Sequence, residues 1–226
     1  ERTLRLPTLA ELSEGESDFD GAGGHHEVTR LAAFIVDSAT PDSKLQVVQI
    51  AAGKGEQDKV PLTLALAREF AEGWSYETLV VDLDGGAFAN LASRTAERSK
   101  MPAAGDELEL IHTTTPKLWA LSQPTGRDSP LTGERLPLER AEAILQALRG
   151  RFQRILLIAP SDYEDYGARR LNPLVDAHIL VVRAERSKAP VLRRLRDVIL
   201  TSGGDMLGLV YTHRRFYIPE RVYRWL

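Results

Sequence analysis

Two carboxylates, Asp82 and Asp84, directly follow the short apolar run 78–81. If this run is a strand, both lie at its carboxyl end, where they could hold Mg²⁺ through water or orient an acceptor hydroxyl. Aspartates are also common in the turn before a helix, where their side chains bind backbone N–H groups. The sequence leaves both interpretations open: catalytic carboxylates, or residues of a turn and helix cap.

The loop after the apolar run 45–51 is a second candidate site. A glycine-containing loop between a strand and a helix is typical of a phosphate-binding loop, whose N–H groups and helix dipole hold phosphates. Such a loop needs a Lys followed by Ser or Thr, but Lys54 precedes Gly and Lys59 precedes Val60. The loop is therefore either a degenerate nucleotide site or an ordinary loop with two glycines. The candidate residues are Gly53, Lys54, Gly55 and Lys59.

The sequence lacks a metal ligand at the position where a phosphoryl-transfer site needs one. The apolar run 155–158 ends in Ile158, at a position where a phosphoryl-transfer site normally carries an Asp for the metal. Asp162 lies too far along the chain to replace it without a changed loop. His25 and His26 lack the further ligands that a metal ion requires. We therefore expect no protein-bound metal ion.

Composition limits the classes of function. The chain has 226 residues, 43% of them hydrophobic, which suffices for one core. A formal net charge of -3 gives no basic excess for nucleic acid. The sequence contains no cysteine, which excludes disulfides and thiolate metal sites. No apolar run is long enough to span a bilayer and the first residues lack a signal-peptide core, so we expect a cytoplasmic protein.

The elements that must position these residues alternate along the chain. Uninterrupted apolar runs separated by helical patterns predict an α/β fold, a doubly wound and mostly parallel sheet with helices on both faces. Ligands of such a sheet bind at the carboxyl ends of its strands. The predicted strands are 45–51, 78–81, 107–111, 117–121, 155–158, 178–182 and 206–211, and the predicted helices are 27–37, 62–70, 86–98, 138–148 and 190–202.

The two ends of the chain differ from its middle. Residues 1–26 are polar and predict a flexible N-terminal arm, and residues 27–226 form a single domain. The last segment, 213–226, interleaves arginines with aromatic residues. Such a tail could lie on an anionic membrane surface, dock on a partner, or pack on the body of the domain.

Several segments together resemble the cytoplasmic domain of the bacterial tyrosine kinases that control capsule and exopolysaccharide synthesis. That family belongs to the deviant-Walker ATPases, which have a P-loop fold shared with division-site (MinD-type) and chromosome-partitioning (ParA-type) ATPases. The resemblance covers nearly all of residues 27–212. Its segments are Glu-x-x-Arg at 27–30, the apolar run with Asp-x-Asp at 79–84, and stretches 117–130, 151–160, 174–183 and 206–212.

The resemblance also implies roles for single residues. Glu27 and Arg30 match the helix that mediates ring assembly, although Ala33 stands where the family often has a further Arg. Thr212 stands in place of the Asn that contacts adenine, and Ile158 in place of the metal-binding Asp.

The nucleotide motifs of the family are degenerate in this chain. Its Gly-Glu-Gly-Lys-Ser-Thr loop is lost at about 54–59, and only Asp82 and Asp84 remain. Without the loop Lys and the metal ligand, charge at the transferring phosphate is not neutralised. We therefore expect a pseudo-ATPase that needs no cofactor.

The leading hypothesis is a degenerate tyrosine-kinase-like scaffold or regulator in exopolysaccharide, capsule or holdfast-type polysaccharide synthesis and export. The resemblance implies a partner, a membrane-anchored polysaccharide co-polymerase that regulates chain length. This partner would recruit the chain to the inner face of the membrane. The resemblance also implies that the chain could form a homo-oligomer. Helix 27–37 and tail 213–226 are the candidate docking surfaces. The alternative is an active tyrosine kinase that binds ATP and Mg²⁺ and uses Asp82 or Asp84. A third hypothesis places the fold in cellulose synthesis or partitioning.

Overall fold

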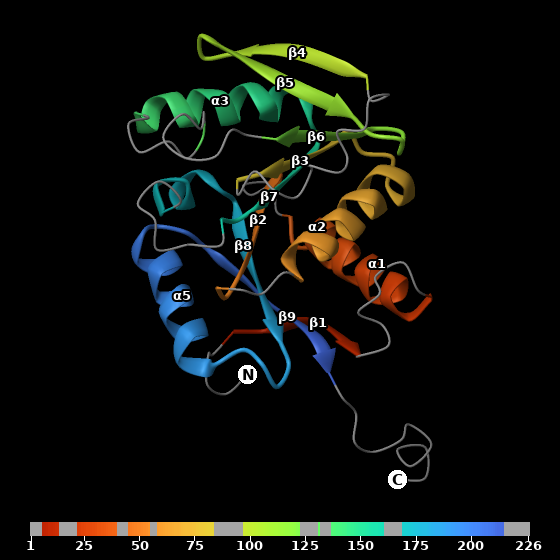
Figure 1. Ribbon diagram of the computed structural model, residues 1–226, viewed down its shortest axis with the longest axis vertical. Helices are drawn as coiled ribbons and strands as arrows, with labels where there is room; N and C mark the ends of the chain where they lie inside the picture. Colours follow the sequence, from red (N-terminus) through yellow and green to blue (C-terminus); the bar gives the residue numbers. More distant parts are fainter. Residues whose placement is uncertain are drawn as a thin grey trace.

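Nine strands of the described residues form one sheet in the computed structural model (Figure 1). Their order is β1-β9-β8-β2-β7-β3-β6-β5-β4. Neighbours from β1 to β6 in this row are parallel, and β5 and β4 continue the row antiparallel. The structure describes residues 6–13, 22–39, 45–54, 58–83, 97–122, 131, 137–160 and 169–214.

The elements alternate as the sequence predicts. The strands are β1 Thr8–Ser13, β2 Val47–Ala52, β3 Thr78–Asp82, β4 Arg98–Ala103, β5 Asp106–His112, β6 Leu118–Ser122, β7 Arg154–Ile158, β8 Ala177–Arg183 and β9 Met206–Arg214. The helices are α1 Ala22–Asp37, α2 Lys59–Arg68 with its π-helical continuation η1 Glu69–Gly73, α3 Leu138–Arg151, the 3₁₀ turn η2 Asn172–Leu174 and α5 Ala189–Thr201.

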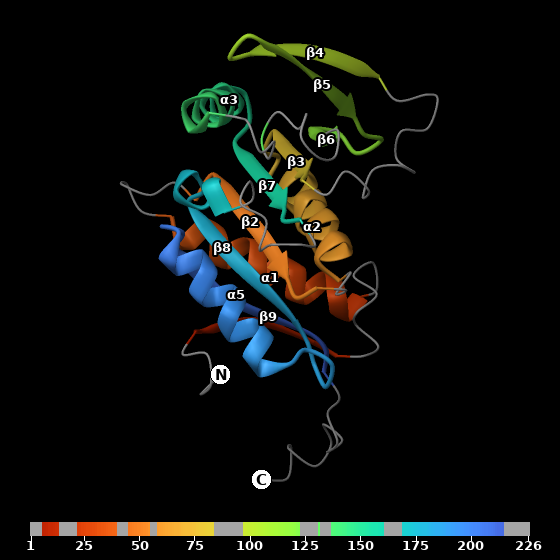
Figure 2. The same ribbon diagram turned by 60° about the vertical axis from the view of Figure 1, so that its left-hand side comes forward.

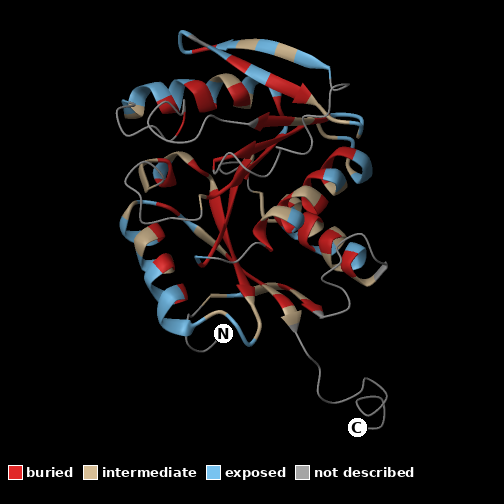
Figure 3. Ribbon diagram, in the orientation of Figure 1, coloured by how far each residue is buried: buried red, intermediate tan, exposed pale blue. Residues whose placement is uncertain are grey.

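Strands β2, β3 and β7 are buried at every residue, because helices cover both faces of the sheet (Figure 3). Successive side chains of a strand point to opposite faces. Val48 and Ile50 accordingly pack in the layer of α1 and α2, whereas Val47 packs in the layer of α3. Figure 2 shows α5 on the opposite side of the sheet from α1. The predicted fold class is therefore confirmed.

The structure corrects the prediction of a flexible N-terminal arm. Residues 8–13 form β1, an edge strand parallel to β9, so the expectation of flexibility across 1–26 is wrong there. Ala10 and Leu12 are buried, because alternate residues of the strand face the core. Helix α1 also begins earlier than predicted, at Ala22. Among Thr8–Leu12, whose burial the structure describes, only Ala10 and Leu12 are buried, so this strand has no continuous apolar run that the sequence would reveal.

The hairpin β4–β5 is the second difference. Most of the predicted helix 86–98 lies outside the described residues, but Arg98 begins β4. Arg98 and Lys100 are exposed and pair across the hairpin with Glu109 and Glu107, at 2.7 and 2.6 Å. A charged edge strand has no apolar run to reveal it.

The end of the chain is described only in part. Strand β9 extends to Arg214, so the first two residues of the predicted tail belong to the sheet, and residues 215–226 lie outside the described part. Among the described residues, no helix combines the length and apolarity required to cross a bilayer.

Candidate functional site

The predicted site residues meet at the carboxyl ends of the central strands. Asp82 ends β3 and lies opposite Ile158, the last residue of β7, in the parallel ladder. Ile158 in turn pairs with β2, which leads directly into Gly53 and Lys54. Asp82 is fully buried, whereas Lys54 is exposed. Asp84 and Gly55 lie outside the described residues.

Lys59, the first residue of α2, is buried beside these strand ends. It lies six positions after Gly53, the spacing of the first Gly and the Lys in a phosphate-binding loop. Its side chain does not extend into solvent: the residue is 3% exposed, and Nζ donates a 2.6 Å hydrogen bond to the carbonyl oxygen of Ala159. The ammonium group is therefore engaged within the protein, one residue beyond Ile158.

Asp58 occupies the position of the second glycine in that spacing and is the centre of a polar cluster. Its Oδ2 accepts a 2.6 Å hydrogen bond from the hydroxyl of Thr212, which is fully buried. His213 Nε2 lies 3.4 Å from the same oxygen. Arg183 Nη1 lies 3.7 Å from Oδ1. We call these four residues the Asp58 cluster; it joins the start of α2 to the ends of β8 and β9.

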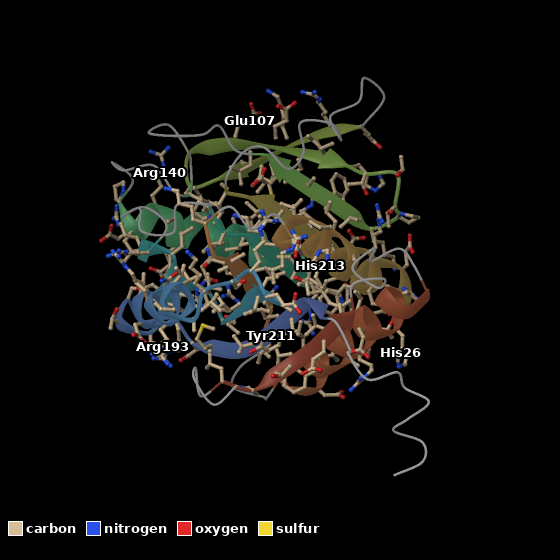
Figure 4. The ribbon with its side chains drawn as sticks, turned by 60° about the horizontal axis from the view of Figure 1, so that its bottom comes forward. His26, Glu107, Arg140, Arg193, Tyr211 and His213 are labelled. Carbon is tan, nitrogen blue, oxygen red and sulfur yellow. The ribbon has the colours of Figure 1, made fainter. Side chains whose placement is uncertain are left out.

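His213 extends from the end of β9 toward α2 (Figure 4), and its backbone is unusual. Its φ of 54° lies in the left-handed region. A non-glycine residue there costs roughly 1–3 kcal/mol and persists only where the surroundings hold it. The contact with Asp58 is part of those surroundings.

The partners of Asp58 are not among the site residues that the sequence predicts. By the resemblance, Thr212 replaces the Asn that contacts adenine; in the structure its hydroxyl donates a hydrogen bond to the Asp58 carboxylate of the same chain. Neither Arg183 nor His213 stands at a position that the sequence motifs mark as a site. The usable signal was their position, because each lies at or near the carboxyl end of an apolar run.

Mg-ATP does not fit the residues present. The second glycine of the loop, needed for close approach of the phosphate, is Asp58, and the Mg²⁺-binding Ser or Thr is Val60. Ile158 offers no metal ligand. No group of three or more His, Asp or Glu residues that could hold a metal exists in the described ranges. We therefore derive no chemical step through a nucleotide.

Glu27 and Arg30 lie one turn apart on α1 and form a 2.8 Å ion pair with each other. The Arg30 side chain is 62% exposed. Their predicted part in oligomerisation stays a prediction.

No protein-family model and no curated protein sequence matches this chain. Solved structures do match. The chimerical protein CapA2B2 superposes with a TM-score of 0.72 at 19% identity, covering 96% of this chain and 98% of that chain. The kinase domain of the Escherichia coli tyrosine kinase ETK gives a TM-score of 0.75 at 12% identity, covering 96% of both chains.

The chain has the fold of a bacterial tyrosine kinase domain. The septum site-determining protein MinD of Pyrococcus horikoshii, a complex with Mg-ADP, is more distant, with a TM-score of 0.53, 16% identity and coverage of 79% and 76% of the two chains. Within this kinase-domain fold, the Asp58 cluster occupies the end of the sheet at which β2 enters its loop.

Proposed function

We propose that this chain is a catalytically degenerate, tyrosine-kinase-like scaffold or regulator of bacterial exopolysaccharide synthesis and export. The kinase-domain fold supports the assignment to this group of proteins. The observation that carries the loss of catalysis is the hydrogen bond from Lys59 to Ala159, beside an Ile158 that cannot bind metal.

The proposed loss of catalysis follows from what phosphoryl transfer requires of a protein. The protein contributes mainly positioning and neutralisation of charge on the transferring group, through a Lys and metal ions. Here the Lys59 ammonium binds a backbone carbonyl, and Val60 and Ile158 replace the two residue types that hold Mg²⁺. Each of these changes weakens the neutralisation of charge during phosphoryl transfer, so together they disfavour catalysis.

The partner we propose is a membrane-anchored polysaccharide co-polymerase that recruits this chain to the inner face of the membrane. Helix α1 supports a docking role, because Phe34 is 41% exposed and lies one turn from the exposed Arg30. A second copy of the chain could use the same helix face, giving the homo-oligomer.

Two observations favour the alternative, an active protein tyrosine kinase. Asp82 is kept at the carboxyl end of β3, and Lys59 is kept at the phosphate-loop spacing from Gly53. Such an enzyme would bind Mg-ATP and use Asp82 toward the acceptor hydroxyl.

A phosphorylation assay separates the two functions. The purified chain is incubated with Mg-ATP, and phosphotyrosine and released phosphate are measured beside Lys59→Met and Asp82→Asn. We expect no phosphotyrosine, and hydrolysis no faster than in either variant. Turnover in the natural chain that both substitutions abolish would make it an active kinase and end the scaffold proposal.

A further inference from the structure

The carboxylate of Asp58 is turned away from its own helix. Asp58 is the residue that caps the N-terminus of α2, yet its side chain makes no capping hydrogen bond. An Asp at this position usually accepts from the N–H groups of the first turn. Here the carboxylate instead points at Thr212, Arg183 and His213, on strands β8 and β9.

These partners have the chemistry of an anion site. Arg183 supplies a permanent positive charge, His213 a second one when protonated, and Thr212 a hydroxyl donor. The carboxylate is well enclosed, because the Asp58 side chain is 13% exposed. Arg and hydroxyl donors suit a phosphate group as well as a carboxylate.

We propose that Asp58 is an internal substitute for a phosphate group: its carboxylate fills an anion site formed by Arg183, His213 and Thr212 and excludes external phosphate. This inference rests on the proposed function, since it explains how the fold is held together where a nucleotide would bind. The anion that would tie α2 to β8 and β9 is part of the chain itself.

The site therefore opens when the carboxylate is removed. Asp58→Gly restores the residue type of a phosphate-binding loop at this position and leaves Thr212 without the acceptor it binds. The ligand class is inorganic phosphate or pyrophosphate, which replaces both the charge and the acceptor atoms. The natural chain should not respond to either anion, because Asp58 is covalently present at the site.

The test is thermal unfolding and calorimetric titration of the full chain with pyrophosphate, against chloride at matched ionic strength. We expect Asp58→Gly to unfold at a lower temperature than the natural chain, and pyrophosphate to raise its midpoint by several degrees with saturable binding. The natural chain should show neither effect. Asp58→Asn keeps the volume without the charge, so it should block the site and also show no binding.

Two further variants test the role of the Arg183 charge and provide for the case in which Asp58→Gly does not fold. Asp58→Gly combined with Arg183→Gln should lose at least tenfold in pyrophosphate affinity, because the permanent charge is gone. If Asp58→Gly does not fold, Asp58→Ser takes its place with the same expectations. Absence of saturable binding in the opened variant, or binding unchanged by Arg183→Gln, overturns this inference and leaves the scaffold function standing. Phosphotyrosine formation by the natural chain with Mg-ATP, in the phosphorylation assay described above, would overturn the scaffold function instead.

Discussion

The ammonium nitrogen of Lys59 lies 2.6 Å from the carbonyl oxygen of Ala159, which joins the first residue of α2 to the residue after β7. In a working phosphate-binding loop the corresponding Lys reaches the β- and γ-phosphates. In this chain the same side chain is a structural link between a helix and a strand end. Its role should therefore appear in stability rather than in ligand binding.

Lys59→Met tests that role directly. The substitution keeps most of the volume but leaves the buried carbonyl of Ala159 without this donor, so we expect a loss of about 1–3 kcal/mol in the free energy of unfolding. Urea denaturation measures it. Lys54→Met, at an exposed position of the same loop, is the matched control and should leave the free energy of unfolding nearly unchanged. Equal stability of the natural chain and Lys59→Met would contradict the structural role.

Asp176 should contribute more than Lys59 to the free energy of unfolding. Its carboxylate accepts from Arg149 Nη2 at 2.6 Å and Nη1 at 2.9 Å, and from the backbone N–H of Val47 at 2.7 Å, so it ties α3 to the start of β2. We expect Asp176→Ala to cost on the order of 3 kcal/mol in unfolding free energy, because it leaves the largely buried charge of Arg149 without its counter-ion and the Val47 N–H without this acceptor.

Glu107→Ala is the control for Asp176. It breaks an ion pair of similar length with Lys100, but on the exposed hairpin, so we expect no measurable loss of stability. Equal effects of the two substitutions in urea denaturation would show that burial does not set the strength of these pairs.

His178 should make stability depend on pH. Burial lowers the pKa of His178 from 6.5 to about 4, and the hydrogen bond with the Asp205 carbonyl offsets only part of this. The unfolded chain therefore binds a proton between pH 6.5 and 4 that the folded chain does not. Stability is full above pH 6.5 and falls by on the order of 3 kcal/mol as the pH drops to 4.

Denaturation curves across that pH range, recorded for the natural chain and for His178→Gln, isolate this effect. The difference between the two proteins should shrink steadily as the pH falls, because only the natural chain loses the histidine contribution. A difference that stays constant with pH would contradict the lowered pKa.

The close approach of β1 to β9 depends on Gly208. A Cβ atom at this position would lie 2.7 Å from the carbonyl oxygen of Pro7 and from the Leu9 side chain. We expect Gly208→Ala to cost about 1–3 kcal/mol and to displace β1. Hydrogen exchange of β1 amides should accelerate. Gly150→Ala, in α3 with nothing within 4 Å, should instead stabilise by about 0.5–1 kcal/mol. Unchanged exchange in Gly208→Ala would contradict the edge pairing of β1.

The central part of the fold was predictable from sequence, because strands buried on both faces are continuous apolar runs. Strand β7 is the clearest example: all five residues, 154–158, are buried, and four of them are Ile or Leu. Edge strands β1 and β4 carry no such run, since only some of their residues face the core.

The site was predictable only in part, for a topological reason. The strand-end rule located Asp82 and the loop with Lys59 from local sequence. The contact of Thr212 with Asp58 joins residues 154 positions apart and depends on the parallel order β9-β8-β2. Nothing in the local sequence around Asp58 specifies which strand ends lie beside it.

The most direct test of the account is thermal unfolding of the natural chain with millimolar Mg-ATP or Mg-ADP, beside Asp82→Ala. We expect no shift of the midpoint in either protein, because Lys59 binds the Ala159 carbonyl and Asp58 binds Thr212 within the chain itself. A nucleotide present at a hundred times its dissociation constant would add about 2.7 kcal/mol of stability. A shift of that size that disappears in Asp82→Ala would contradict the account and establish a working nucleotide site.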